Sequence, residues 1–348
     1  MRRFLVVLVT GGLAAAAADP IPISPSQFHG KDFVKAFIGS YGFLSPVEPK
    51  VDAEEAALLA ELGEMFGRGR FKEAESQLVN FIRLRDRPVD PTQEAKGVSA
   101  AMIFVLGNLY FQNDRVRDAE RSYQLAIKRF PKFRRAFKNL ALLYASSGDM
   151  EKALPNLKQA IQLGDGDHRS FGLLGYAYLL DKKPVAAEGG YRQAYLLNPD
   201  EKDWKMGLAQ ALIMQEKWPE SAALLGELID ETPDSKQLWL QQANAYLGMD
   251  QKMRAAANFE ILRRKGLADV ATLDLLGNIY MDQGQPMLAL GAYLAAMRKG
   301  EGLNIRRSLE TARVLVDYGA TEEALEYVVA VRDQAAGQLT TADQVALL

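Results

Sequence analysis

The chain has 348 residues, of which 48% are hydrophobic, so it is long enough for two ordinary domains or one long array with a buried core. Its 42 Lys and Arg residues nearly balance 44 Asp and Glu residues, and the formal net charge of -2 argues against a nucleic-acid-binding protein. The absence of cysteine excludes disulfides, thiolate metal sites and cysteine nucleophiles.

The first 18 residues have the pattern of a secretory signal. Arg2 and Arg3 precede an apolar run that ends at Leu13, and Ala16 and Ala18 form an A-x-A cleavage site. The run is shorter than the roughly 20 residues that span a bilayer, which argues against a membrane anchor. We therefore expect cleavage after Ala18, export to the periplasm, and a mature protein that does not span the membrane.

Residues 19–54 differ from everything that follows. They open with DPIPISPSQFHG, which is too rich in proline for a helix, and continue with the apolar and aromatic stretch KDFVKAFIGSYGFLSPVEP. The end of a stacked array needs a cover for its apolar edge. We expect a linker and a cap here, and the alternative is a docking element for a partner.

A period of 34 residues runs through residues 100–303 without an insertion and gives six units. LGNLY at 106–110 returns as LGNIY at 276–280, and related stretches stand at each intervening period. Degenerate copies at 55–88 and 304–338 flank the six units, which makes about eight in all. A loop at 89–99 interrupts the phase, and a tail at 339–348 follows the last copy.

Each unit has the pattern of two packed helices. Large residues at the fourth, seventh and eleventh places share one helix face, and small residues at the eighth and twentieth places let antiparallel helices approach closely. Gly148 and Gly284 lie in turns, where a left-handed residue can end a helix. Pro131, Pro199 and Pro233 stop second helices, because proline has no N–H to continue them.

These residues resemble the tetratricopeptide repeat, whose signature places a large residue, Leu-Gly, Tyr, Ala, an aromatic residue, Ala and Pro at these spacings. LGNLYFQNDRVRDAERSYQLAIKRFP and LGYAYLLDKKPVAAEGGYRQAYLLNP carry nearly every element, whereas the unit from Lys202 departs from it with Ser221 and Leu225. The resemblance implies an all-α, right-handed superhelical solenoid of about eight helix hairpins that binds proteins.

The sequence offers almost no material for catalysis. Its two histidines, His29 and His168, lie in different segments, and there is no H-E-x-x-H, phosphate-binding loop or G-x-S-x-G. GDGD at 164–167 lacks the twelfth-position Glu of a calcium loop and falls at a turn. We expect no enzyme activity, no metal and no cofactor.

In the resembled family, the second, fifth, sixth and ninth places of each first helix face a concave groove. Amides recur there, and an amide can pair with both the donor and the acceptor of a peptide backbone; the alternative is that these are solvated positions without a ligand. The predicted partner-binding residues are Phe104, Asn108, Arg135, Lys138, Asn139, Arg169, Tyr176, Gln210, Gln241, Asn244 and Asn278.

A basic group stands out among these places. Arg134 and Arg135 open a helix, where positive charge is locally unfavourable. Together with Lys138 and Arg169, they predict that an anion or a carboxylate is held in the N-terminal half of the groove.

The signal, the GSYGFL stretch at 39–44 and the long array are similar to exported repeat proteins that accompany TonB, ExbB and ExbD-type energy-transducing systems. This implies a periplasmic scaffold that docks inner-membrane components while an outer-membrane receptor imports a glycan or a metal chelate. Two alternatives are open: an assembly factor for pili, exopolysaccharide or outer-membrane proteins, and a glycan- or peptidoglycan-binding protein.

Overall fold

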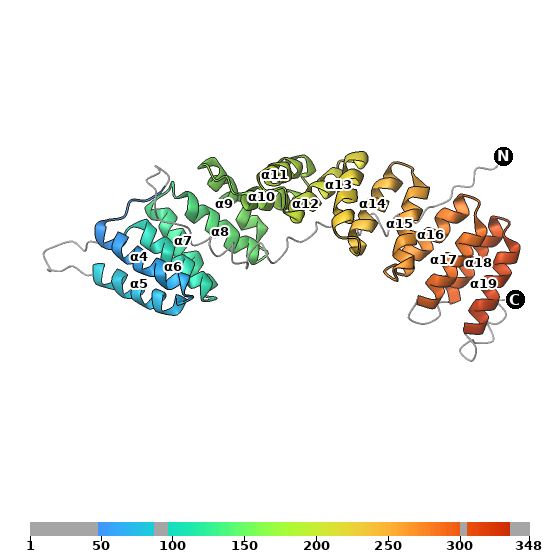
Figure 1. The fold of residues 1–348 in the computed structure, drawn as a ribbon, viewed down its shortest axis with the longest axis horizontal. Coiled ribbons are helices and arrows are strands. Elements are labelled where there is room, and N and C mark those ends of the chain that lie inside the picture. The colour runs from blue at the N-terminus through green and yellow to red at the C-terminus, as the bar shows by residue number, and fades with distance from the viewer. Residues whose placement is uncertain (1–47, 87–96, 300–304, 335–348) are drawn as a thin grey trace. The chain divides into compact units, whose positions relative to one another are not determined.

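The computed structural model describes residues 48–86, 97–299 and 305–334, and all regular structure in these ranges is helical. Sixteen helices, α4 to α19, follow one another as eight pairs joined by short turns (Figure 1). The expected all-α array of about eight helix hairpins is therefore confirmed. The predicted signal at 1–18, the tail at 339–348 and most of the segments 19–54 and 89–99 lie outside the described residues.

The chain divides after Ala211 into two compact units, and each is described by itself. The first contains α4 (Ala53–Gly67), α5 (Phe71–Arg85), α6 (Ala100–Gln112), α7 (Val116–Arg129), α8 (Arg134–Ser146), α9 (Met150–Gln162), α10 (His168–Leu180), α11 (Pro184–Leu197) and most of α12 (Lys202–Ile213). The second contains α13 (Trp218–Glu231), α14 (Lys236–Gly248), α15 (Lys252–Arg264), α16 (Val270–Asp282), α17 (Pro286–Lys299), α18 (Ile305–Asp317) and α19 (Thr321–Gln334). None of the helices in the described ranges is both long and apolar enough to cross a bilayer.

The 34-residue period is visible in the backbone itself. The first helix of each regular unit starts at the first residue of that unit, from Ala100 to Val270. The fifteenth residue of each unit is left-handed and ends this helix, with Gly148 at φ 78° and Gly284 at φ 66°, as predicted. The other four units place Asp114, Lys182, Glu216 and Asp250 there at φ 53–59°. Position in the repeat therefore decides this conformation more strongly than residue type does.

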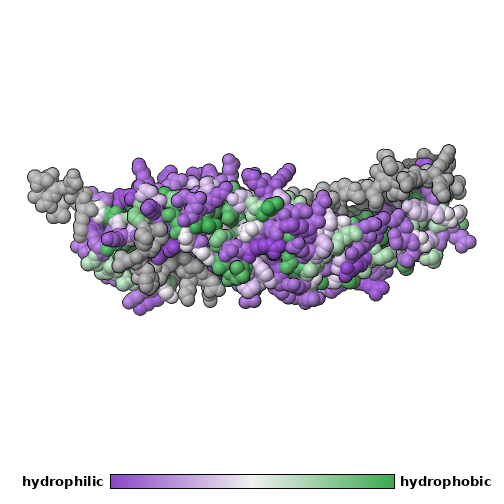
Figure 2. All heavy atoms as spheres, turned by 90° about the horizontal axis from the view of Figure 1, so that it is seen from above, coloured by the Kyte–Doolittle hydropathy of each residue, from purple (hydrophilic) through white to green (hydrophobic). Residues whose placement is uncertain are grey.

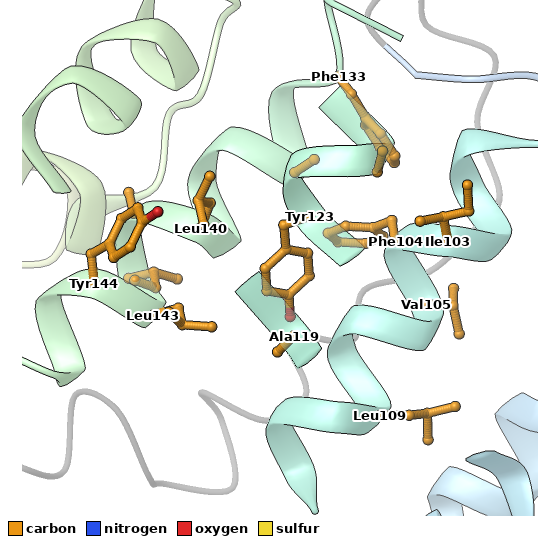
Figure 3. Close-up of a cluster of buried hydrophobic side chains, with 14 of the residues drawn as sticks. Ile103, Phe104, Val105, Leu109, Ala119, Tyr123, Phe133, Leu140, Leu143 and Tyr144 are labelled. Atoms are coloured by element: carbon orange, nitrogen blue, oxygen red, sulfur yellow. The ribbon is translucent and has the colours of Figure 1, made fainter. Parts of the chain in front are cut away.

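The core of the first unit lies between neighbouring hairpins. Phe104 of α6 packs against Tyr123 of α7 and Phe133 before α8, with ring centroids 5.7 and 4.9 Å away, and all three side chains are fully buried (Figure 3). Ala119, at the twentieth place, is also fully buried, as the spacing of small residues predicts. Each hairpin thus completes its core against the next one, which is how repeat proteins gain stability.

The eighth and twenty-fourth places of a unit share a fixed space. A Cβ atom added at Gly107 would lie 2.6 Å from the ring of Tyr123, and one added at Gly277 would lie 2.3 Å from the ring of Tyr293. A tyrosine at the twenty-fourth place therefore needs glycine at the eighth. The units with alanine at the eighth place instead carry Leu157, Leu225 and Phe259 at the twenty-fourth.

The apolar side chains that remain exposed are spread over several helices. They include Val185 and Leu196 on α11, Met287 on α17 and Leu325 on α19. On the face that Figure 2 shows, hydrophilic residues predominate and apolar residues form small areas. Single exposed apolar residues are normal for a folded surface.

The backbones of α10 and α11 touch at Gly190. A Cβ atom added at Gly190 would lie 2.8 Å from the backbone nitrogen of Gly175 and 3.0 Å from the carbonyl oxygen of Phe171, whereas one added at the adjacent Gly189 would meet nothing within 4 Å. Backbone atoms cannot move aside as a flexible side chain can.

We expect Gly190→Ala to lower the free energy of unfolding by about 1–3 kcal/mol, because the added methyl group forces α10 and α11 apart. Gly189→Ala is the matched control and should raise it by about 0.5–1 kcal/mol, since alanine is the better helix former. Urea unfolding followed by circular dichroism measures both changes. Equal effects of the two substitutions would show that the backbones do not touch.

Candidate functional site

The basic residues of α8 and α10 meet at the turn that precedes α10. Lys138 Nζ lies 2.5 Å from Asp167 Oδ2 and 3.9 Å from Asp165 Oδ1. Asp167 also caps α10, because its Oδ1 accepts a hydrogen bond from the backbone N–H of Arg169 at 2.8 Å. Lys138 and Arg169, which belong to neighbouring repeats, are therefore brought together around one carboxylate.

The charge state of Asp167 follows from this arrangement. Burial works against ionisation of Asp167, but the charge of Lys138 and the hydrogen bonds from Lys138 and the Arg169 N–H outweigh it, so the pKa of Asp167 lies below its usual value. The carboxylate is ionised at neutral pH. It fixes Lys138 against the helix start.

Arg169 is the least neutralised cation of this group. Its backbone bonds to Asp167, but its side chain forms no ion pair among the described residues, and its Nε atom is buried without a hydrogen-bond partner there. A buried donor without an acceptor is costly. An acceptor from a ligand would remove that cost.

Arg134 and Arg135 contact the chain's own carboxylate at Glu48. Glu48 Oε1 lies 3.4 Å from Arg134 Nη2 and 3.2 Å from Arg135 Nε, and the Glu48 side chain is only 8% exposed. Burial raises the pKa of Glu48, and the charges and hydrogen bonds of the two arginines offset only part of this rise. We name the group Arg134, Arg135, Lys138 and Arg169 the basic cluster.

Several residues that the sequence assigns to the groove have packing roles instead. The prediction that Phe104 is presented to a partner is wrong, because its ring is fully buried between Tyr123 and Phe133. The same correction applies to Asn108 and Asn139, which are 1% and 2% exposed. Asn108 Oδ1 accepts hydrogen bonds from the Tyr123 hydroxyl at 2.8 Å and from Asn139 Nδ2 at 2.9 Å. The two amides thus join α6, α7 and α8.

The predicted residues further along the chain fall into three groups. Gln210 and Gln241 are buried, so the prediction that they are exposed in a groove is also wrong. Tyr176 and Asn244 are half-buried. Asn278 is exposed, and its Oδ1 accepts a hydrogen bond from the Tyr293 hydroxyl at 2.7 Å. Of these, Gln241, Asn244 and Asn278 belong to the second compact unit, so they are no part of the basic cluster.

The bond between Tyr293 and Asn278 repeats the one between Tyr123 and Asn108. In both cases the twenty-fourth residue of a unit donates to its ninth residue. These are the two units with the LGN motif, and both combine Asn at the ninth place with Tyr at the twenty-fourth. This co-occurrence in the sequence could have revealed the structural role of the two asparagines.

Three carboxylates contact the basic cluster without having been predicted to do so: Glu48, Asp165 and Asp167. The N-cap position of Asp167, immediately before a helix, is a signal that sequence reading could have used. Glu48 gives no such signal, because its partners are 86 residues away along the chain.

A half-buried histidine, His168, stands beside the basic cluster. The Trp204 indole N–H donates to His168 Nδ1 at 2.9 Å, and Trp204 is fully buried against Gly172 of α10. Since an indole nitrogen can only donate, His168 Nδ1 has to accept, and the imidazole is neutral. Burial lowers the pKa of His168, as do Arg169 and Lys138, while Asp167 and Glu201 act in the opposite direction.

Stability should fall as the pH decreases from 7 to 5.5. The pKa of His168 is lower in the folded protein than in the unfolded chain, so the unfolded chain takes up a proton first and stability is lost below about pH 6.5. Melting temperatures measured by Trp fluorescence should show this decrease for the wild type and a smaller one for His168→Gln. A wild-type profile for His168→Gln would contradict the assignment.

Comparisons with known proteins agree with this architecture. Residues 104–168 and 178–245 match models of the tetratricopeptide repeat family. No match to a curated protein was significant.

Similar solved structures include a tetratricopeptide repeat protein from Parabacteroides merdae (21% identity, 75% of this chain and 98% of that one, TM-score 0.44). Two others are YrrB, described as having an unusual peptide-binding site (17%, 56% and 91%, 0.44), and PilF of Pseudomonas aeruginosa (19%, 61% and 96%, 0.41). On the regular 34-residue units, the paired helices and the two family matches, the chain is a tetratricopeptide repeat protein.

Proposed function

We propose that this protein is a non-enzymatic scaffold that binds a protein partner through the basic cluster on α8 and α10. Tetratricopeptide repeats indicate protein–protein interaction. The observation that carries the proposal is the side chain of Arg169, which is partly buried, has a donor without an acceptor and forms no ion pair among the described residues. It lies beside Lys138 and Asp167, which hold the surrounding backbone in place.

The chemistry of the cluster favours an acidic segment of the partner. Within the described ranges, the four cations of the cluster lie around the carboxylates of Glu48, Asp165 and Asp167. A carboxylate from a ligand would supply an acceptor to Arg169, and a guanidinium binds a carboxylate in a fixed, directional geometry. An extended peptide with acidic side chains meets these requirements.

For the cellular role, we propose that the protein is exported to the periplasm and acts as an accessory scaffold of a TonB-type uptake system for a glycan or a metal chelate. The support is the signal pattern of residues 1–18 and the GSYGFL stretch at 39–44. Both lie outside the described residues. The partners would then be TonB, ExbB and ExbD-type inner-membrane components.

Arg169→Gln should weaken the capture of the partner at least tenfold, because it removes the cation of the cluster that forms no ion pair within the described part of the chain. The measurement is quantitative affinity capture from crosslinked native cells with the protein from Asp19 onward. Transducer components in the captured set, lost in the variant, would support the transport role.

Arg117→Gln is the matched control for this experiment. Arg117 is exposed on α7, so the substitution removes the same charge outside the cluster. Circular dichroism melts confirm that both variants fold. Capture of pilus or outer-membrane assembly proteins would favour that alternative, and full capture by Arg169→Gln would remove the cluster as the binding site.

A further inference from the structure

Glu48 makes an unusually distant contact for a repeat array. It lies five residues before α4, which opens the first hairpin, yet its carboxylate contacts the first two residues of α8, in the third hairpin. In a solenoid each repeat normally contacts only its neighbours. The side chain of Glu48 therefore contacts the third hairpin, which follows the second one, α6 and α7, in the chain.

The start of α8 has a local need for negative charge. Its N-cap residue, Phe133, forms no side-chain cap, and its first turn contains no acidic residue but two arginines. Helix N-termini favour anions, so this start is unfavourable without a carboxylate from elsewhere. Glu48 supplies that carboxylate.

The fit of Glu48 to this place is loose. Both arginines share one oxygen, at 3.2 and 3.4 Å, whereas good charge-assisted hydrogen bonds measure roughly 2.7–2.9 Å. Burial of the carboxylate opposes its ionisation more than the arginines support it, as the raised pKa of Glu48 shows. A ligand carboxylate with a better approach could replace it.

The neighbouring Arg169 gives such a ligand an advantage. A peptide with two acidic side chains can place one carboxylate at Arg134 and Arg135 and offer the other to Arg169, which forms no ion pair among the described residues. Glu48, as a single side chain, provides only the first contact. The ligand therefore gains an interaction that the internal carboxylate lacks.

We propose that Glu48 is a built-in competitor that occupies the carboxylate subsite of Arg134 and Arg135, and that an acidic peptide binds there by displacing it. This inference rests on the proposed function, since it describes the regulation of the same site. In the free protein Glu48 occupies the subsite, and in the peptide-bound protein Glu48 is displaced from it.

The test is the affinity of fluorophore-labelled hexaglutamate for the protein from Asp19 onward, measured by anisotropy, with hexaglutamine as the neutral probe. Glu48→Gln should bind hexaglutamate about tenfold more tightly than the wild type. Combining Glu48→Gln with Arg134→Gln and Arg135→Gln should remove this gain. Glu64→Gln is the matched control, because Glu64 is an exposed glutamate of α4 that pairs with Arg68, and it should bind as the wild type does.

The outcomes separate the two proposals. Equal affinity of the wild type and Glu48→Gln, with binding still dependent on Arg169, would overturn the competitor and leave the proposed function standing. An equal increase in hexaglutamate affinity for Glu64→Gln would show that the increase comes from the change in net charge alone, and it would also overturn the competitor role of Glu48. No preference of Glu48→Gln for hexaglutamate over hexaglutamine would overturn the carboxylate subsite and the competitor together.

A second measurement follows the displacement itself. Lys50 is exposed and close to Glu48 in the chain, and the protein contains no cysteine, so Lys50→Cys can carry a single environment-sensitive dye. Its fluorescence should change over the same hexaglutamate concentrations that produce binding. A constant signal during saturation would show that Glu48 stays in place, which contradicts the competitor.

Discussion

The fixed space between the two helices of a hairpin is the constraint on which the whole array depends. Where the second helix carries a tyrosine, as at Tyr123 and Tyr293, the first helix has glycine opposite its ring. Where the first helix has alanine, the second carries leucine or phenylalanine. The summed size of the pair is thus held within narrow limits, as close packing in protein interiors demands.

The succession of hairpins assembles the basic cluster. Arg135 and Arg169 occupy the second place of successive units, so the stacking of the hairpins brings the starts of α8 and α10 to comparable positions. The ion pair from Lys138 to Asp167 then ties the two starts together. The basic cluster therefore lies on helix starts that the packing of the hairpins holds in place.

The fold could be predicted from the sequence because its determinants repeat. The places that Gly148 and Tyr123 occupy, the fifteenth and the twenty-fourth, have the same structural role in every regular unit, so six imperfect copies reinforce one interpretation. The prediction that Asn108 faces a partner was wrong for a related reason. It rested on the place of Asn108 in the helix and overlooked Tyr123 of the same unit, whose hydroxyl donates a hydrogen bond to it. The contact of Glu48 with Arg134 belongs to no periodic pattern, and only the folded chain shows it.

The loose carboxylate at the start of α8 has a consequence for selectivity. A group attached to the same chain acts at an effective concentration that can reach millimolar values for short flexible connections. Acetate, free amino acids and other single carboxylates at lower concentrations cannot outcompete it. Only a molecule that presents several negative charges at the right spacing can displace Glu48. The weak internal contact therefore prevents small anions with a single carboxylate from occupying the subsite.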